Sequence, residues 1–77
     1  MSNIGTVKWF NSRRGYGFII PEDKKPEDKD VFFHVSALHR INLDRLDEGQ
    51  IVEYETYDDR GRIAADIINL LGFAKRH

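Results

Sequence analysis

Two short runs of the chain combine aromatic, basic and histidine side chains, which are residue types that bind unpaired nucleobases. Residues 14–20 read RGYGFII and residues 31–35 read VFFHV. Because side chains alternate between the two sides of a strand, every second residue of each run lies on one face. If the runs pair as neighbouring strands, one surface collects four rings: Tyr16, Phe18, Phe32 and His34. A histidine among the rings and an arginine just before them are not expected in a hydrophobic core. A surface that stacks bases uses rings and cations together.

A strand expected over Ile4–Asn11 is a third strand that could contribute side chains to this surface. In a regular strand Val7 and Trp9 lie on one face, and Lys8 and Phe10 lie on the other. Simple alternation cannot bury two consecutive large aromatics, because they point to opposite faces. Either a bulge shifts the register, or one aromatic lies on the surface. An exposed tryptophan beside a lysine suits base stacking. The alternative is that Trp9 is an ordinary core residue.

The length and composition indicate one small domain without a metal site or a disulfide framework. The chain has 77 residues and no cysteine, so neither a thiolate metal site nor a disulfide supports the fold. His34, His39 and His77 do not form a spacing typical of zinc ligands. No apolar run approaches the ~20 residues of a membrane span, and the N-terminus lacks the pattern of a signal sequence. We expect a cytoplasmic protein with no metal and no cofactor.

The net charge of −1 argues against a nucleic-acid binder, but its distribution is uneven. Residues 1–20 carry Lys8, Arg13 and Arg14 and no acid, which gives +3. Residues 21–77 carry nine basic and thirteen acidic side chains, which gives −4. A local basic patch on an acidic body can still attract phosphate to one face. We expect modest affinity because few phosphates are neutralised, and charge alone fits an ordinary mixed surface equally well.

Five strands are expected, over Ile4–Asn11, Tyr16–Ile20, Val31–Val35, Ile51–Tyr57 and Ile63–Leu70. Residues 21–30 are all charged except for the two prolines, Pro21 and Pro26, which indicates a solvated loop. The segment Ser36–Glu48 shows no strand alternation. Short helical turns are expected there, with Ser36 as the cap and with leucines covering one end of the domain.

The last part of the chain completes the domain. Asp58–Gly61 indicates a hairpin turn. In the strand after it, Ala65 and Ile67 are expected to face inward. Residues 72–77 are expected to fray. The whole chain, 1–77, is then a single domain with its core over about residues 4–70.

The predicted fold is all-β, a five-stranded antiparallel OB-fold barrel with a short helical turn between the third and fourth strands. Closure into a barrel removes the exposed edges that a small open sheet would leave. In an OB-fold the second and third strands face oligonucleotides, and here those strands carry the aromatics. The alternative is the four-stranded RNA-recognition fold, because Arg14–Phe18 fits the start of its octamer consensus. That fold needs two packing helices, for which the chain leaves no room.

The motifs, taken together, resemble those of the bacterial cold-shock proteins. The matching stretches are GTVKWFN at residues 5–11, RGYGFI at 14–19, DVFFHVSAL at 30–38 and EGQ at 48–50. The resemblance extends from about residue 4 to residue 68. It implies a cold-shock domain that binds single-stranded RNA and DNA, as an RNA chaperone or a regulator of transcription or translation in the stress response. It also implies no enzymatic activity, no cofactor, no small-molecule substrate and no membrane partner. We expect a monomer, although the connection before the fourth strand is long enough for a strand-swapped dimer.

The resemblance also assigns nucleic-acid-binding roles to particular residues. The stacking positions are Trp9, Tyr16, Phe18, Phe32 and His34, with Phe10 at their edge. The basic positions near the nucleic-acid path are Lys8, Arg14 and Arg60. Asn11 and Asp30 match polar positions at the rim, where base-edge hydrogen bonds are expected. We also expect the glycines beside Tyr16 to let the nucleic acid approach the backbone closely.

Several positions depart from the pattern of the family. Val35 and Leu43 stand where the family has aromatics. Because each base stack contributes roughly 1–3 kcal/mol, we expect fewer strong base subsites. Phe33 stands where the family more often has a smaller apolar residue. Its place in the strand alternation indicates that it faces the core. The loop at residues 21–29 is longer than is typical of the family.

Two other classes of function are alternatives to nucleic-acid binding. The acidic body and the two missing aromatics favour a protein–protein adaptor that keeps the barrel and has a reduced nucleic-acid site. An enzyme is not favoured, because His34 has no evident nucleophile or orienting partner. The paired acids Asp58 and Asp59 belong to a turn and imply no pocket.

Overall fold

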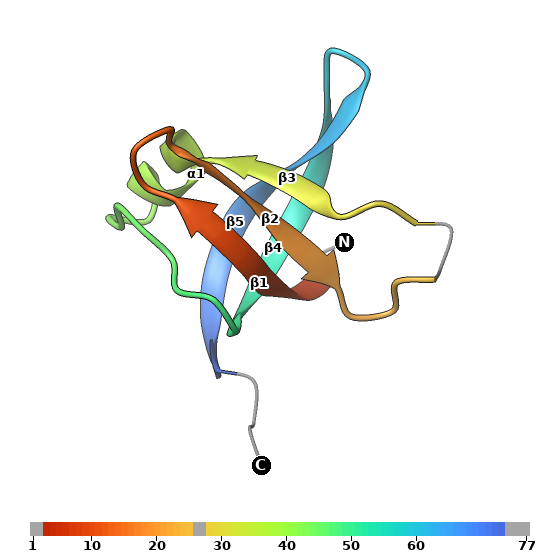
Figure 1. The fold of residues 1–77 in the computed structure, drawn as a ribbon, viewed down its shortest axis with the longest axis horizontal. Coiled ribbons are helices and arrows are strands. Elements are labelled where there is room, and N and C mark those ends of the chain that lie inside the picture. Colours follow the sequence, from red (N-terminus) through yellow and green to blue (C-terminus); the bar gives the residue numbers. More distant parts are fainter. Residues whose placement is uncertain (1–2, 26–27, 74–77) are drawn as a thin grey trace.

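The computed structural model describes residues 3–25 and 28–73, which form five strands and one short helix (Figure 1). In chain order the elements are β1 (Asn3–Asn11), β2 (Tyr16–Pro21), β3 (Val31–His34), α1 (Val35–His39), β4 (Gln50–Asp59) and β5 (Arg62–Phe73). The strands close into a barrel in the order β1-β2-β3-β5-β4, and β4 pairs back onto β1. The predicted five-stranded OB-fold barrel is therefore confirmed. Within the two described ranges, no helix has the length and apolar character needed to cross a membrane.

One seam of the barrel differs from the antiparallel expectation. Four pairs of strands are antiparallel, whereas β3 and β5 pair in parallel through Phe32 and Ala64. The chain leaves β3 through α1 and returns by way of the β4–β5 hairpin, so β5 runs in the same direction as β3. This seam closes the sheet and covers edges that would otherwise be available to other chains.

The core is lined by inward-facing residues of all five strands. They are Val7, Ile19, Val31, Phe33, Val52, Tyr54, Ala65 and Ile67. The connection from β3 to β4 covers one end of the barrel through Leu38 and Leu46, with Ile41 and Leu43 packed beside them (Figure 1). This arrangement confirms that leucines cover one end of the domain. It also confirms Phe33, which is fully buried, as a core residue.

An irregular register in β1 resolves the conflict between its two aromatics. Consecutive residues of β2 pair with Val7 and Trp9, so Lys8 is an extra residue between them. This β-bulge reverses the alternation after Val7. As a result Val7 and Phe10 both face the core, while Lys8 and Trp9 lie on the outer side. The bulge and the outward aromatic, which were expected as alternatives, thus occur together, and the alternative of Trp9 as an ordinary core residue was wrong.

The helix begins directly after β3, two residues earlier than a cap at Ser36 would give, so Val35 belongs to α1. Its N-cap is His34, whose Nδ1 accepts a hydrogen bond from the backbone N–H of Ser36 at 3.1 Å. The prediction of Ser36 as the cap was wrong. The imidazole of the last strand residue reaches the first turn and satisfies one of the N–H groups that a helix leaves unpaired there.

The β4–β5 hairpin is longer than predicted at both ends. Strand β5 continues through Phe73, so the first part of the expected frayed tail is in a strand, and residues 74–77 lie outside the described residues. The expected hairpin turn is present. Arg60 and Gly61 have φ values of 56° and 88°, as a type I′ turn requires. Its tip, where the Gly61 N–H donates to Asp58 Oδ1 at 2.8 Å, projects beyond the barrel (Figure 1).

Gly17 in β2 faces the core, which differs from the expected role of the β2 glycines in ligand approach. A Cβ at this position would lie 2.5 Å from the carbonyl oxygen of Trp9 and 2.8 Å from the ring of Phe33. Gly17 therefore makes room for a core ring beneath the strand. Gly15, with a φ of 73°, supplies the left-handed backbone that ends the β1–β2 turn.

We expect Gly17→Ala to lower the free energy of unfolding by about 1–3 kcal/mol, the range for overpacking a filled core. The added methyl group would have to displace the Phe33 ring or the Trp9 backbone. Urea unfolding followed by far-UV circular dichroism measures the change. Ser12→Ala is the control, because Ser12 is an exposed residue of the β1–β2 turn. Equal unfolding free energies for the two variants would contradict the close packing at Gly17.

Candidate nucleic-acid interface

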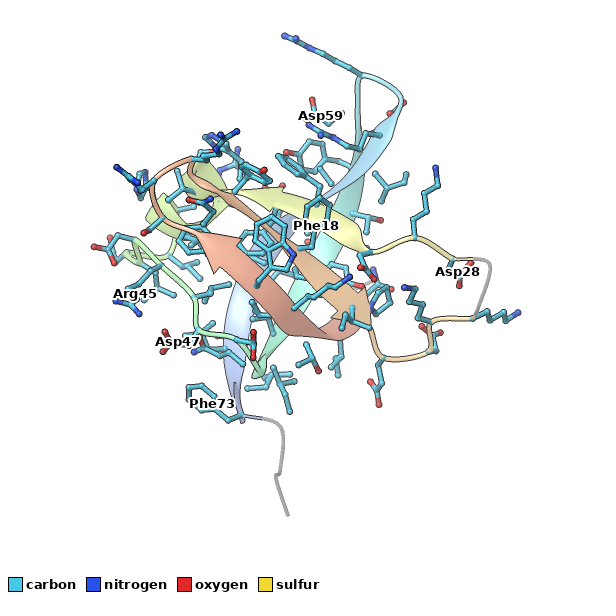
Figure 2. All side chains as sticks on the ribbon, in the orientation of Figure 1. Phe18, Asp28, Arg45, Asp47, Asp59 and Phe73 are labelled. Carbon is cyan, nitrogen blue, oxygen red and sulfur yellow. The ribbon has the colours of Figure 1, made fainter. Side chains whose placement is uncertain are left out.

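Four rings from three strands lie together on the outer side of the β1–β2–β3 sheet. The centroid of Trp9 is 5.5 Å from that of Tyr16 and 5.2 Å from that of Phe18. The centroid of Phe32 is 5.8 Å from that of Tyr16 and 6.0 Å from that of Phe18. We call the cluster of Trp9, Tyr16, Phe18 and Phe32 the ring face. Phe18 lies near the middle of Figure 2, in front of these strands.

The register of the strands produces this cluster. Phe18 pairs with Trp9 on one side and with Phe32 on the other, so three aromatic residues form a row across β1, β2 and β3. Side chains directly opposite one another on one face of a sheet are close enough to touch. Trp9, Tyr16 and Phe18 are half-buried, whereas Phe32 is only 9% exposed. Three of the four rings therefore keep part of their surface in contact with solvent.

His34 lies beside the ring face, paired in register with Tyr16. Its ring is exposed, and its orientation is set by Ser36. Nδ1 accepts from the Ser36 N–H and lies 2.9 Å from the Ser36 Oγ. These two contacts hold the imidazole at the end of β3, where it can offer a ring surface to a ligand.

Phe10 lies on the opposite side of β1 from the ring face. Its ring stacks on that of Phe33, with centroids 5.7 Å apart and an angle of 11° between the planes. Val35 and Leu43, at the two positions where the resemblance implies aromatics, are also partly buried against the core. The structure therefore directs these three side chains inward and does not bring Phe10 together with the predicted stacking residues.

The carboxylate of Asp30 joins two lysines at one end of the ring face. Lys8 Nζ lies 2.9 Å from one oxygen and Lys24 Nζ lies 2.7 Å from the other. The hydrogen bond from Lys24, and then that from Lys8, hold the pKa of Asp30 below its ordinary value although partial burial acts the other way. Two predicted residues, Lys8 and Asp30, thus meet directly. Lys24, which the sequence assigned to a solvated loop, completes the cluster.

Asn11 shapes the β1–β2 turn at the other end of these strands. Its Oδ1 accepts hydrogen bonds from the N–H groups of Arg13 at 3.0 Å and Arg14 at 3.1 Å. Its own carbonyl oxygen accepts from the N–H of Gly15 at 2.8 Å. These bonds form a compact turn typical of asparagine. The turn presents the exposed side chain of Arg14 just before the start of β2.

An open groove of about 1020 Å³ lies along the ring face, beside the start of β5. Its lining includes Lys8, Trp9, Phe18, Asp30, Phe32 and Arg62. A second hollow is lined by His34, Asp59, Arg60 and Arg62. Seven of the predicted residues line one or other of these hollows, and Arg62 borders both. The other four, Phe10, Asn11, Arg14 and Tyr16, line neither.

Arg62 is a residue of the site that the sequence interpretation missed. Its guanidinium carbon lies 3.8 Å from the centroid of the Phe32 ring. Strand alternation could have indicated its orientation, because Ala65 and Ile67 face inward and even-numbered positions of β5 therefore face outward. That this outward position meets Phe32 depends on the parallel β3–β5 seam, which no local pattern predicts.

Comparison with known proteins identifies the same kind of domain over most of the chain. Residues 3–70 match the 'Cold-shock' DNA-binding domain. The chain is 47% identical to the probable cold shock protein y4cH of Sinorhizobium fredii, over 86% of this chain and 94% of the relative. It is 47% identical to the major cold shock protein of Micrococcus luteus, over 87% and 97%. It is 50% identical to the cold shock-like protein CspE of Buchnera aphidicola, over 91% and 100%.

We expect Asp30→Asn to lower the free energy of unfolding at neutral pH by up to about 1 kcal/mol, the range for partly exposed ion pairs. Because the pKa of Asp30 is lower in the folded than in the unfolded chain, its contribution is present above the ordinary value of 3.8 and is lost as the pH falls through the folded value. The difference between wild type and variant should therefore shrink below about pH 4. Urea unfolding at a series of pH values measures it.

Asp44→Asn is the control for this series, because Asp44 is an exposed acid in the connection after α1. Subtracting its effect removes the general consequence of losing one carboxylate. A difference between wild type and Asp30→Asn that is the same at every pH would contradict the lysine–aspartate cluster.

Proposed function

The chain belongs to the cold-shock domain family, and from this premise we propose that its ring face binds single-stranded RNA and DNA, as an RNA chaperone or a regulator of transcription or translation. Family membership supports nucleic-acid binding of the cold-shock type. The observation that carries the choice of surface is the row of Trp9, Phe18 and Phe32 across three strands. Within this row, Trp9 and Phe18 offer partly exposed ring surfaces, and such surfaces recognise the faces of unpaired bases.

Base stacking provides the main attraction in this mechanism. Successive bases lie on Trp9, Tyr16 and Phe18, and His34 extends the surface at the end of β3. Each base–aromatic stack contributes roughly 1–3 kcal/mol, and it tolerates sequence because every base has a π-face. Val35 and Leu43 pack against the core. We therefore infer fewer strong subsites than a full set of family aromatics would give.

Cations at the border of the ring face attract the phosphates. Lys8 lies beside the groove, Arg14 lies in the β1–β2 turn and Arg60 lies at the hairpin tip. Asn11 and Asp30 are the polar groups that we assign to base edges. With about two or three phosphates neutralised, the logarithm of affinity should fall with the logarithm of salt concentration by about 0.7 per phosphate.

The mechanism discriminates against duplexes. Paired bases in a helix are stacked on their neighbours and cannot present their faces to Trp9 or Phe18. Binding a duplex would therefore require unpairing it first. A protein of this kind keeps single strands unpaired without a catalytic step, and we assign none to His34, whose Nδ1 is engaged by Ser36. We place this activity in the cytoplasm, with the closed barrel acting as a monomer.

We expect Phe18→Ala to weaken binding of a short oligothymidylate or uridine-rich RNA by about 1–3 kcal/mol, roughly fivefold to over a hundredfold. The reason is the loss of the central ring of the row. The measurement is quenching of Trp9 fluorescence during titration at low salt, with a duplex of the same sequence as the comparison. Phe73→Ala is the matched control, because Phe73 is 60% exposed at the far end of β5, away from Phe18 (Figure 2).

Two results would count against the proposal. Absence of quenching in the wild type at ligand concentrations on the order of tens of micromolar would contradict nucleic-acid binding on the ring face. Equal affinities of Phe18→Ala and Phe73→Ala would contradict the assignment of the surface. Either result would favour the alternative, an adaptor that has kept the barrel and binds other proteins.

A further inference from the structure

The ring of Phe32 is covered although it belongs to the ring face. Its exposed fraction is 9%, yet it is not a member of the core cluster. Arg62 covers one side of the ring, because its guanidinium carbon lies 3.8 Å from the centroid of the Phe32 ring. Tyr16 also stacks against this ring, with the two centroids 5.8 Å apart. A planar guanidinium over an aromatic face is a favourable cation–π contact. A base cannot stack on that side of Phe32 while Arg62 stays in place.

The start of β5 holds Arg62 in this position. Ala64 pairs with Phe32 across the β3–β5 seam; it is fully buried but not part of the core cluster, so it lies on the outer side of the strand. Arg62 is two residues earlier and has the same orientation. Its Nη2 also lies 3.6 Å from Oδ2 of Asp59. The guanidinium is therefore positioned by a ring on one side and by a carboxylate at its edge.

The outer side of the guanidinium remains accessible. The side chain of Arg62 is 58% exposed despite both contacts. It borders the groove that contains Trp9 and Phe18, and also the hollow that contains His34. A single strand that passes from Trp9 toward His34 therefore crosses Arg62.

We propose that Arg62 forms a base-stacking subsite of its own, in which one base of a single-stranded RNA or DNA lies on the guanidinium and Phe32 supports it from below. This inference rests on the proposed function. Unpaired bases stack on arginine planes as they do on aromatic rings. The subsite adds a stacking plane to a surface from which Val35 and Leu43 are turned away. Phe32 then acts through Arg62, and Arg62 contacts the base.

The test titrates wild type, Arg62→Lys and Arg62→Ala with a short oligothymidylate over a series of KCl concentrations. Arg62→Lys keeps the positive charge and removes the plane. We expect both variants to bind about fivefold more weakly or worse, which is the lower limit for losing one base stack. For Arg62→Lys the dependence of affinity on salt should be unchanged, because the number of cations is the same.

Arg45→Lys and Arg45→Ala are the matched controls. Arg45 is 71% exposed and pairs with Asp47 at 3.0 Å, and Figure 2 shows this pair well away from Phe18. Both controls should bind as the wild type does. A second measurement follows the Arg62 Nε–H resonance by NMR, which a stacked base should shift upfield through its ring current. Thermal unfolding by circular dichroism checks that every variant is folded.

The possible results separate this inference from the proposed function. Wild-type affinity in Arg62→Lys, with no upfield shift, would overturn the stacking subsite and leave Arg62 as a surface cation. Tighter binding by Arg62→Ala would overturn it as well, because it would mean that Arg62 competes with bases for Phe32. In both cases the wild type still binds, and the proposed function stands. A wild type that does not bind contradicts the proposed function and removes this subsite with it.

Discussion

The one-residue bulge at Lys8 is the constraint on which both faces of the barrel depend. A regular strand would keep Val7 and Trp9 on one side and Phe10 on the other. Since Val7 is buried, with 1% exposure, Trp9 would then follow it into the core and Phe10 would face solvent. The bulge instead sets Phe10 against the core ring of Phe33 and sets Trp9 against Phe18. One extra residue therefore provides a complete core and a tryptophan on the ring face.

The core and the ring face are two sides of the same strands, so packing on one side fixes the other. Gly17 and Phe33 face inward and pair with each other, and their neighbours on either side face outward. Because Gly17 has no side chain, the Phe33 ring can lie directly beneath β2. This contact sets how closely β2 and β3 approach, and so it sets the spacing of the outward rings. A surface whose rings are already positioned by the backbone needs little ordering when it binds a ligand, which leaves more of the stacking energy for affinity.

Much of this organisation could be predicted from the sequence because it follows from alternation and local turn chemistry. The bulge, the inward Phe33 and the hairpin turn depend on residues close together in the chain. The row of aromatics follows once the three strands are paired in chain order. The His34 cap could not be predicted in this way, since it depends on where β3 ends. Lys24 and Arg62 were missed for a related reason. Arg62 reaches Phe32 through a seam that brings distant residues together. Lys24 lies only six residues from Asp30, but in a loop without a regular pattern, where a charged side chain gives no sign of its partner.

The charges around the ring face explain how an acidic protein can carry this surface. Lys8 and Lys24 share the carboxylate of Asp30, and Arg62 lies near that of Asp59. Each pairing holds a long, flexible cation in one place at the expense of its net charge, so a phosphate must compete with a carboxylate for it. Exposed ion pairs of this kind are worth little by themselves, whereas a base stack contributes roughly 1–3 kcal/mol. The rings must therefore dominate the affinity, and the cations chiefly define the path along which a single strand crosses them.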